Sequence, residues 1–140
     1  MEKFIDFDFG TLPIIIISAH GGDLNPDCIK DRIKGNITPD LYTLELSKEL
    51  FKQIEKVYQK KPYKLFCNLS RKKIDLNRSI YYGTNCKEGK KIWKDWFKIL
   101  DLMIKDINKK FNYGIMFDIH GHGGNDETVW FGYGIKKEDL

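Results

Sequence analysis

The chain is built around Ile14-Ile15-Ile16-Ile17-Ser18-Ala19-His20-Gly21-Gly22-Asp23, in which four isoleucines run into a histidine followed by two glycines. Consecutive β-branched residues leave neither face of a strand polar, which is typical of a central strand in a parallel sheet that is covered on both faces. In such sheets ligands bind just beyond the carboxyl ends of the strands. His20 is therefore the first candidate for a functional residue.

The remaining pattern predicts further strands at residues 4–9 (an edge strand), 63–67, 113–119 and 128–135. Apolar residues at helical spacing predict a helix at 92–111, with its tryptophans and methionine in the core, and another ending near residue 59. The helix that ends near residue 59 is expected to begin at Thr38-Pro39-Asp40, with a hydroxyl cap, a proline at the first helical position and an acid in the first turn. Strands alternating with helices predict an α/β fold in three layers, with a mostly parallel or mixed sheet flanked by helices.

Composition narrows the class of protein. At 140 residues and 41% hydrophobic residues, the chain is most simply one domain, residues 1–140. We expect a soluble, cytoplasmic protein with no membrane partner, because the sequence has neither a signal-peptide pattern nor an apolar run that is long enough to span a bilayer. The net charge of +4 comes mostly from scattered lysines, which argues against a nucleic-acid partner. Three widely spaced cysteines are expected to be free thiols.

Polar loops follow three of the predicted strands, and they contain His20 to Asp23, residues 71–78, and His120-Gly121-His122. Loops at one edge of a parallel sheet can share a cleft. Two histidines and a carboxylate with one open position form the usual site of a catalytic zinc ion, and His20 and His120 are the candidate histidines. The acid is Asp23 or Asp40, although Asp23 also suits a turn and Asp40 also suits a helix N-terminus. His122 is a candidate substrate contact or a solvent-exposed residue.

Only three of the 24 basic residues are arginine, namely Arg32, Arg71 and Arg78. In a chain that uses lysine so freely, an arginine suggests a planar, bidentate contact that lysine cannot make. Arg71 and Arg78 are candidates for binding a substrate carboxylate and polarising a carbonyl, with Asn77 adding a hydrogen bond. The alternative is that both arginines form ordinary ion pairs with Asp75 or other nearby acids.

Several short motifs occur in order along the chain: Ser18-Ala19-His20-Gly21-Gly22, Asn68-Leu69-Ser70-Arg71, Asp75-Leu76-Asn77-Arg78 and Asp118-Ile119-His120-Gly121-His122-Gly123. Together they resemble the N-formylglutamate amidohydrolase family, which is similar in fold and site layout to zinc carboxypeptidases. The resemblance implies a zinc-dependent hydrolase that cleaves the C–N amide bond of a small carboxylate-bearing substrate, of the N-formylglutamate or N-acyl amino acid type. It also implies that His20, His120 and an acid, more convincingly Asp40 than Asp23, hold one zinc ion. Arg71 would stabilise the oxyanion, and Asn77 and Arg78 would bind the substrate carboxylate.

Members of that family are usually longer, and the carboxypeptidase-like site takes its general-base glutamate from a later segment. The resemblance therefore implies a domain that is incomplete at its C-terminus, with Glu127 or Glu138 as the remaining candidates for the base. Two alternatives stay open at this point. One is a carboxylate-binding relative without turnover, and the other is a two-metal phosphoesterase or amidohydrolase that uses His120 and His122 as a ligand pair.

Overall fold

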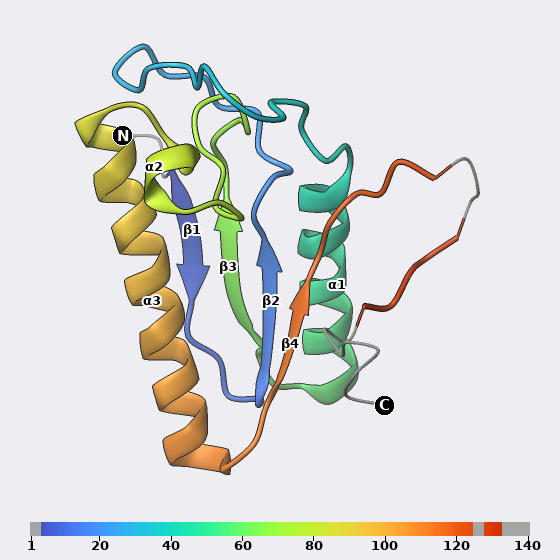
Figure 1. Ribbon diagram of the computed structural model, residues 1–140. Helices are drawn as coiled ribbons and strands as arrows, with labels where there is room; N and C mark the ends of the chain where they lie inside the picture. The colour runs from blue at the N-terminus through green and yellow to red at the C-terminus, as the bar shows by residue number, and fades with distance from the viewer. Residues whose placement is uncertain (1–3, 125–127, 133–140) are drawn as a thin grey trace, which may run out of the picture.

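The computed structural model describes residues 4–124 and 128–132, which form a mixed four-stranded sheet between two long helices (Figure 1). The strands are β1 (Ile5–Asp8), β2 (Ile14–Ser18), β3 (Tyr63–Cys67) and β4 (Ile115–Asp118), arranged in the order β1-β3-β2-β4. Strands β2, β3 and β4 are parallel, and β1 is antiparallel to β3. The predicted α/β class with a mixed sheet is thus confirmed.

The fold has three layers, a sheet between two helices, because the isoleucines of β2 alternate between the two faces of the sheet. Ile15 and Ile17 pack into a core with Trp96 and Met103 of helix α3 (Lys87–Phe111). Ile16 lies in a second core on the opposite face, with Leu44 of helix α1 (Thr43–Tyr58). The two helices therefore cover opposite faces of the sheet (Figure 1), and the expected core positions in the second helix are confirmed for Trp96 and Met103.

Two helix starts differ from the prediction. Helix α1 begins at Thr43, so Thr38-Pro39-Asp40 is not its first turn, and Tyr42 precedes the helix in the left-handed conformation. The physical reason is that Asp40 is held outside the helix, where its backbone N–H donates to the carbonyl of His20 at 3.1 Å. Helix α3 begins five residues earlier than residue 92, at Lys87, and the Sγ of Cys86 accepts from the N–H of Gly89 at its start. A short helix, α2 (Ile80–Gly83), lies between β3 and α3.

The predicted strand at residues 128–135 is not formed in the part that the structure describes. Residues 128–132 have no strand partner, and residues 133–135 lie outside the described residues. The strand expected at 63–67 is confirmed as β3 with the same bounds, and the strands expected at 4–9 and 113–119 are confirmed as β1 and β4 with narrower bounds. Strand formation requires hydrogen-bonding partners as well as suitable residues, and none of the four described strands pairs with residues 128–132.

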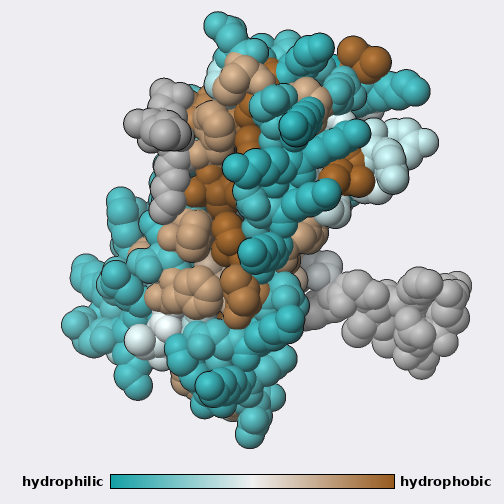
Figure 2. Space-filling view, turned by 90° about the vertical axis from the view of Figure 1, so that its left-hand side faces the viewer, coloured by the Kyte–Doolittle hydropathy of each residue, from teal (hydrophilic) through white to brown (hydrophobic). Residues whose placement is uncertain are grey.

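The surface on the α3 side carries a band of hydrophobic side chains between hydrophilic areas (Figure 2). Phe97, Leu102 and Ile104 of α3 are among the exposed large hydrophobic residues.

Among the described residues, no helix is long and apolar enough to cross a bilayer. All three cysteines are free thiols as expected, Cys28 at the surface and Cys67 and Cys86 in the interior.

Candidate metal centre

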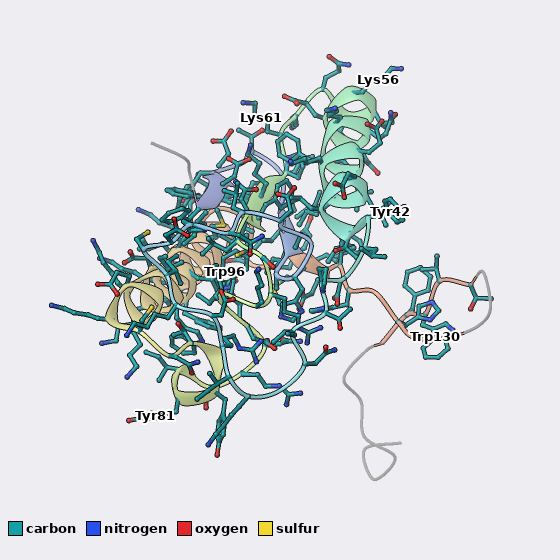
Figure 3. All side chains as sticks on the ribbon, turned by 90° about the horizontal axis from the view of Figure 1, so that it is seen from above. Tyr42, Lys56, Lys61, Tyr81, Trp96 and Trp130 are labelled. Carbon is teal, nitrogen blue, oxygen red and sulfur yellow. The ribbon has the colours of Figure 1, made fainter. Side chains whose placement is uncertain are left out.

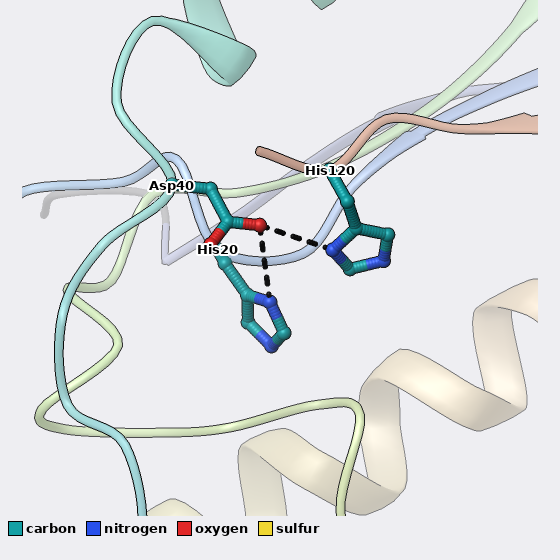
Figure 4. Close-up of side chains that lie close together, drawn as sticks. All are labelled: His20, Asp40 and His120. Atoms are coloured by element: carbon teal, nitrogen blue, oxygen red, sulfur yellow. Dashed lines mark hydrogen bonds and ion pairs between the residues drawn. The ribbon is translucent and has the colours of Figure 1, made fainter. Parts of the chain in front are cut away.

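Three side chains from distant parts of the chain meet at the carboxyl end of the sheet (Figure 4). His20 follows β2, His120 follows β4, and Asp40 precedes α1. One ligand atom of each residue lies within 4.8 Å of the other two. The Oδ2 of Asp40 is 3.6 Å from the Nδ1 of His20 and 3.1 Å from the Nδ1 of His120. Atoms bound at 2.0–2.1 Å to one tetrahedral ion lie roughly 3.4 Å apart, so this group could hold a metal ion with small adjustments.

The glycines after His20 allow this convergence because they let neighbouring backbone approach closely. A Cβ at Gly21 would lie 2.5 Å from the backbone nitrogen of Leu44, at the start of α1. A Cβ at Gly22 would lie 2.3 Å from the carbonyl carbon of Asn68, in the loop that follows β3. That loop and the loop after β2 continue side by side beyond the sheet, through bridges such as that between Gly22 and Ser70. The expected meeting of the three polar loops at one sheet edge is thus confirmed.

His20 is fully buried and its ring is oriented by a second carboxylate. Its Nε2 lies 2.9 Å from the Oδ1 of the buried Asp75. Burial alone would raise the pKa of Asp75, but hydrogen bonds from His20 and from the N–H of Asn77, with the charge of Arg71, hold that pKa well below its usual value. The ionised Asp75 can only accept, so the Nε2 of His20 carries a hydrogen, and Nδ1 is the ring nitrogen left for a metal ion.

The Nδ1 of His20 is a buried polar atom without a hydrogen-bond partner. It faces the Oδ2 of Asp40, an acceptor, across 3.6 Å. A buried ring nitrogen without a hydrogen-bond partner that faces a carboxylate at this distance suits a cation or a proton between the two atoms. This orphaned nitrogen is the clearest local indication that the group suits a metal ion.

His120, like His20, lies between two carboxylates, but its side chain is more exposed. Its Nδ1 lies 3.1 Å from Asp40 and its Nε2 lies 3.2 Å from the Oδ2 of Asp118. The hydrogen bond with Asp118 outweighs burial and, with Asp40, raises the pKa of His120 to about 9. In the absence of a metal this imidazole is therefore protonated at neutral pH and paired with both carboxylates. Binding of a metal ion at Nδ1 requires the loss of that proton.

Arg71 completes the charge balance around the half-buried Asp40 and the buried Asp75. Its Nη1 donates to the Oδ1 of Asp40 at 3.1 Å and its Nε donates to the Oδ2 of Asp75 at 3.3 Å. Asn77 lies next to His120, with its Nδ2 3.5 Å from the Nε2 of that histidine. Arg71 and Asn77, both predicted to contact substrate, therefore adjoin the metal-binding group, and Arg71 also makes the ion pair with Asp75 that was the alternative.

Arg78 lines a different surface feature, a hollow of about 270 Å³ whose other residues include Arg32, Lys34 and Tyr82. Arg32 is buried and donates to four backbone carbonyls, those of Lys34, Asn36, Arg71 and Tyr82. Its Nη2 also lies 3.5 Å from the Oδ2 of Asp75. The multidentate contact expected of a rare arginine is thus made by Arg32, as an organiser of the loops.

The other predicted site residues are not brought into the group. Asp23 is exposed, and its backbone carbonyl accepts from Asn25 at 2.6 Å. His122 stacks on Trp130 with ring centroids 4.3 Å apart, its Nε2 lies 2.7 Å from the carbonyl of Thr128, and its Nδ1 accepts from the N–H of Gly124. His122 therefore does not join His120 in a ligand pair. Glu127 and Glu138, the candidate bases, lie outside the described residues.

Sequence reasoning missed Asp75 and Asp118 as partners of the two histidines. Asp75 entered as a possible ion-pair partner of arginine and as part of a motif, and Asp118 entered only as part of a motif. Each lies at a recognisable place, since Asp75 is the lone acid of a basic loop and Asp118 ends a strand two residues before His120. Metal-binding histidines usually donate their second ring N–H to a carboxylate or carbonyl, so an acid close to each histidine was the available signal.

Comparison with known proteins adds no relative to this picture. No protein-family model matches the chain, and neither the curated proteins nor the solved structures give a match.

Proposed function

We propose that this domain is a zinc-dependent hydrolase that cleaves the C–N amide bond of a small carboxylate-bearing substrate. The observation that carries the proposal is the orphaned Nδ1 of His20, which faces Asp40 and His120 in an arrangement with room for an ion. Two imidazoles and one carboxylate match the three-ligand sets of catalytic zinc sites, which keep a fourth position open. When bound, zinc in such a set acts as a Lewis acid toward a carbonyl and activates water at neutral pH.

The residues around the group support a reaction at a carbonyl next to an anionic group. The guanidinium of Arg71 lies against Asp40, within reach of the ligand set, where it suits stabilisation of a developing oxyanion. The side-chain amide of Asn77 lies beside His120, and Arg78 and Lys34 line the separate hollow of about 270 Å³. Cationic and amide donors of this kind bind carboxylates well. The sequence resemblance to N-formylglutamate amidohydrolases favours N-formylglutamate or another N-acyl amino acid as the substrate.

The test is metal content and hydrolysis in matched histidine variants. We expect one zinc ion per chain in the wild type and in His122→Ala, because His122 is engaged with Thr128 and Trp130. His20→Ala and His120→Ala should lose the ion and the hydrolysis of N-formylglutamate or related N-acyl amino acids. Full hydrolytic activity in His120→Ala would refute the proposal, and two ions per chain would favour the two-metal alternative.

A second candidate function is carboxylate binding without turnover. It is favoured by the placement of Arg78, Lys34 and Arg32 around a hollow that includes none of the three metal-binding residues. If this is the function, calorimetry should detect binding of an N-acyl amino acid to metal-free protein, binding should be lost in Arg78→Ala, and no product should form on long incubation with zinc. Product formation that depends on His120 would exclude it.

A further inference from the structure

Strand β4 is an open edge of the sheet. It is last in the strand order, it pairs with β2 along one side, and no described strand pairs with its other side. Met116 lies opposite Ile15, so it is on the α3 face, and Ile115 is on the α1 face. Ile115 and Met116 remain 57% and 51% exposed, which means that neither helix layer covers β4. An uncovered apolar edge strand is a template for pairing with another strand.

The edge is also hollowed on the α3 side. Ile104, Ile107 and Gly114 line a depression of about 140 Å³ together with Ile115 and Met116. Ile15, at the core of the sheet, forms part of its wall. This depression offers an apolar binding surface for a large side chain, next to the backbone groups of β4 that no described strand pairs with.

The same chain carries an exposed segment with the complementary properties, residues 128–132, here called the arm. Val129, Trp130 and Phe131 of the arm are 78%, 64% and 73% exposed. Its β-branched and aromatic residues have high strand propensity, which is why the sequence predicts a strand there. Figure 3 shows Trp130 well outside the body formed by the sheet and helices, so the arm does not cover the β4 of its own chain.

The arm is held in this outward position by local contacts. Trp130 stacks on His122 at 4.3 Å, and its Nε1 donates to the Oγ1 of Thr128 at 2.9 Å. Because the arm follows β4 in the chain and points away from the molecule, it can reach the β4 edge of a neighbouring copy. A two-fold arrangement would let each of two copies use its arm and its edge at once.

We propose that two copies of this chain associate by laying the arm of each along the β4 edge of the other. The residues 128–131 that precede Gly132 match the four residues of β4 in length. Because consecutive strand residues point to opposite faces, one of the neighbouring aromatic residues Trp130 and Phe131 faces the depression on the α3 side and the other faces the α1 side. Each aromatic side chain offers roughly 150–250 Å². Because Trp130 and Phe131 are 64% and 73% exposed, four of them contribute roughly 400–700 Å². Val129 and the exposed edge residues Ile115 and Met116 of both copies bring the area toward the lower end of the range of about 1,200–2,000 Å² that specific interfaces bury.

This association would also alter the surroundings of the candidate metal centre. His120 follows the end of β4 by two residues, so a strand added to this edge lies beside it. The neighbouring copy would then lie next to His120. The inference does not depend on the proposed hydrolase activity, since it concerns surfaces alone.

The first test is the molar mass of the protein in solution, measured by light scattering and sedimentation equilibrium from micromolar to millimolar concentration. We expect the mass to rise from 16.5 kDa to twice that value. The double variant Trp130→Ser/Phe131→Ser and the edge variant Met116→Lys should both remain monomeric. Val57→Ser, which removes an equally exposed hydrophobic residue from α1, should associate like the wild type. Circular dichroism and thermal unfolding confirm that each variant is folded.

The second test separates arm-to-edge contact from pairing of two edges. The arm variant keeps an intact edge and Met116→Lys keeps an intact arm, so an equimolar mixture should form heterodimers with one restored contact. A mixture that stays monomeric would overturn the proposal, as would a wild type that is monomeric at every concentration. Binding of monomers to lipid vesicles through Trp130 would also overturn it, by assigning the arm to membranes.

Discussion

Replacement of Asp75 by asparagine tests the view that this carboxylate aims His20 at a metal ion. The substitution keeps the shape of the side chain but removes the charge that fixes the hydrogen on Nε2 of His20, 2.9 Å away. Loss of such a partner typically weakens metal binding 10- to 100-fold, which corresponds to about 1.4–2.8 kcal/mol. We therefore expect Asp75→Asn to bind zinc 10- to 100-fold more weakly in a competition titration with a chelator.

The same substitution should destabilise the protein without metal. Asp75 neutralises Arg71 and the buried Arg32, so its removal leaves buried positive charge uncompensated. Breaking a buried pair of this kind costs about 3–5 kcal/mol. At roughly 3–5 °C per kcal/mol for a chain of this length, Tm should fall by about 10 °C or more. Urea unfolding of the metal-free protein measures the free energy directly.

The pH dependence gives this prediction a sign. The pKa of Asp75 is lowered in the folded protein, so the stability it contributes is complete above the unfolded value of about 3.9 and is lost as pH falls below it. The stability difference between wild type and Asp75→Asn should therefore be constant from pH 7 to about pH 5 and should narrow below about pH 4. A difference that disappears at neutral pH would contradict the assigned charge.

Asp23→Asn is the matched control, because Asp23 is an exposed acid outside the metal-binding group. It should leave zinc affinity unchanged and shift stability by no more than about 0.5 kcal/mol, as surface substitutions usually do. The reasoning is refuted if Asp75→Asn binds zinc within two-fold of the wild type, or if Asp23→Asn weakens zinc binding as strongly as Asp75→Asn.

Three further predictions concern proton release on metal binding, the close backbone approach at Gly21 and the reactivity of two cysteines. Because the pKa of His120 is raised to about 9, zinc binding should release a proton below that pH. The apparent affinity for zinc should therefore rise about tenfold per pH unit and level off near pH 9. Calorimetry in buffers of different ionisation enthalpy measures the number of protons released. Gly21→Ala should lower the free energy of unfolding by about 1–3 kcal/mol and weaken zinc binding. The reason is that the new Cβ would lie 2.5 Å from the backbone nitrogen of Leu44 and displace the start of α1. Urea unfolding measures the first effect and metal titration the second. Cys28 should react with a thiol reagent in the native protein, whereas burial raises the pKa of Cys67 to about 12, so Cys67 should react only after unfolding; mass spectrometry of the labelled protein distinguishes the two.

The regular core could be predicted from the sequence because periodicity reports burial directly. Four isoleucines specify a strand that is covered on both faces, and β2 contributes Ile15 and Ile17 to one core and Ile16 to the other. The apolar stripe of α3 likewise predicts Trp96 and Met103 as core residues. The topological rule that parallel strands direct their following loops to one edge then accounts for the meeting of His20 and His120.

Features that depend on tertiary contacts were less accessible. Thr38-Pro39-Asp40 has the composition of a helix start, but the helix begins at Thr43 because Asp40 is drawn to the carbonyl of His20 and to Arg71. No local rule reports those partners, which are 20 and 31 residues away. The same holds for Asp75, whose contact with His20 spans 55 residues and becomes visible only when the loops are placed.

The two histidines differ in burial, and this difference determines how an ion would enter the group. His20 is fixed in the interior by Asp75, and its Nδ1 makes no hydrogen bond that an ion would have to replace. The side chain of His120 is 30% exposed, and its ring is protonated at neutral pH between Asp40 and Asp118. We therefore expect His20 and Asp40 to form the preorganised half of the site, and His120 to join after losing its proton. Removal of Asp118 should consequently change the pH dependence of metal binding more than removal of Asp75, which should change its strength.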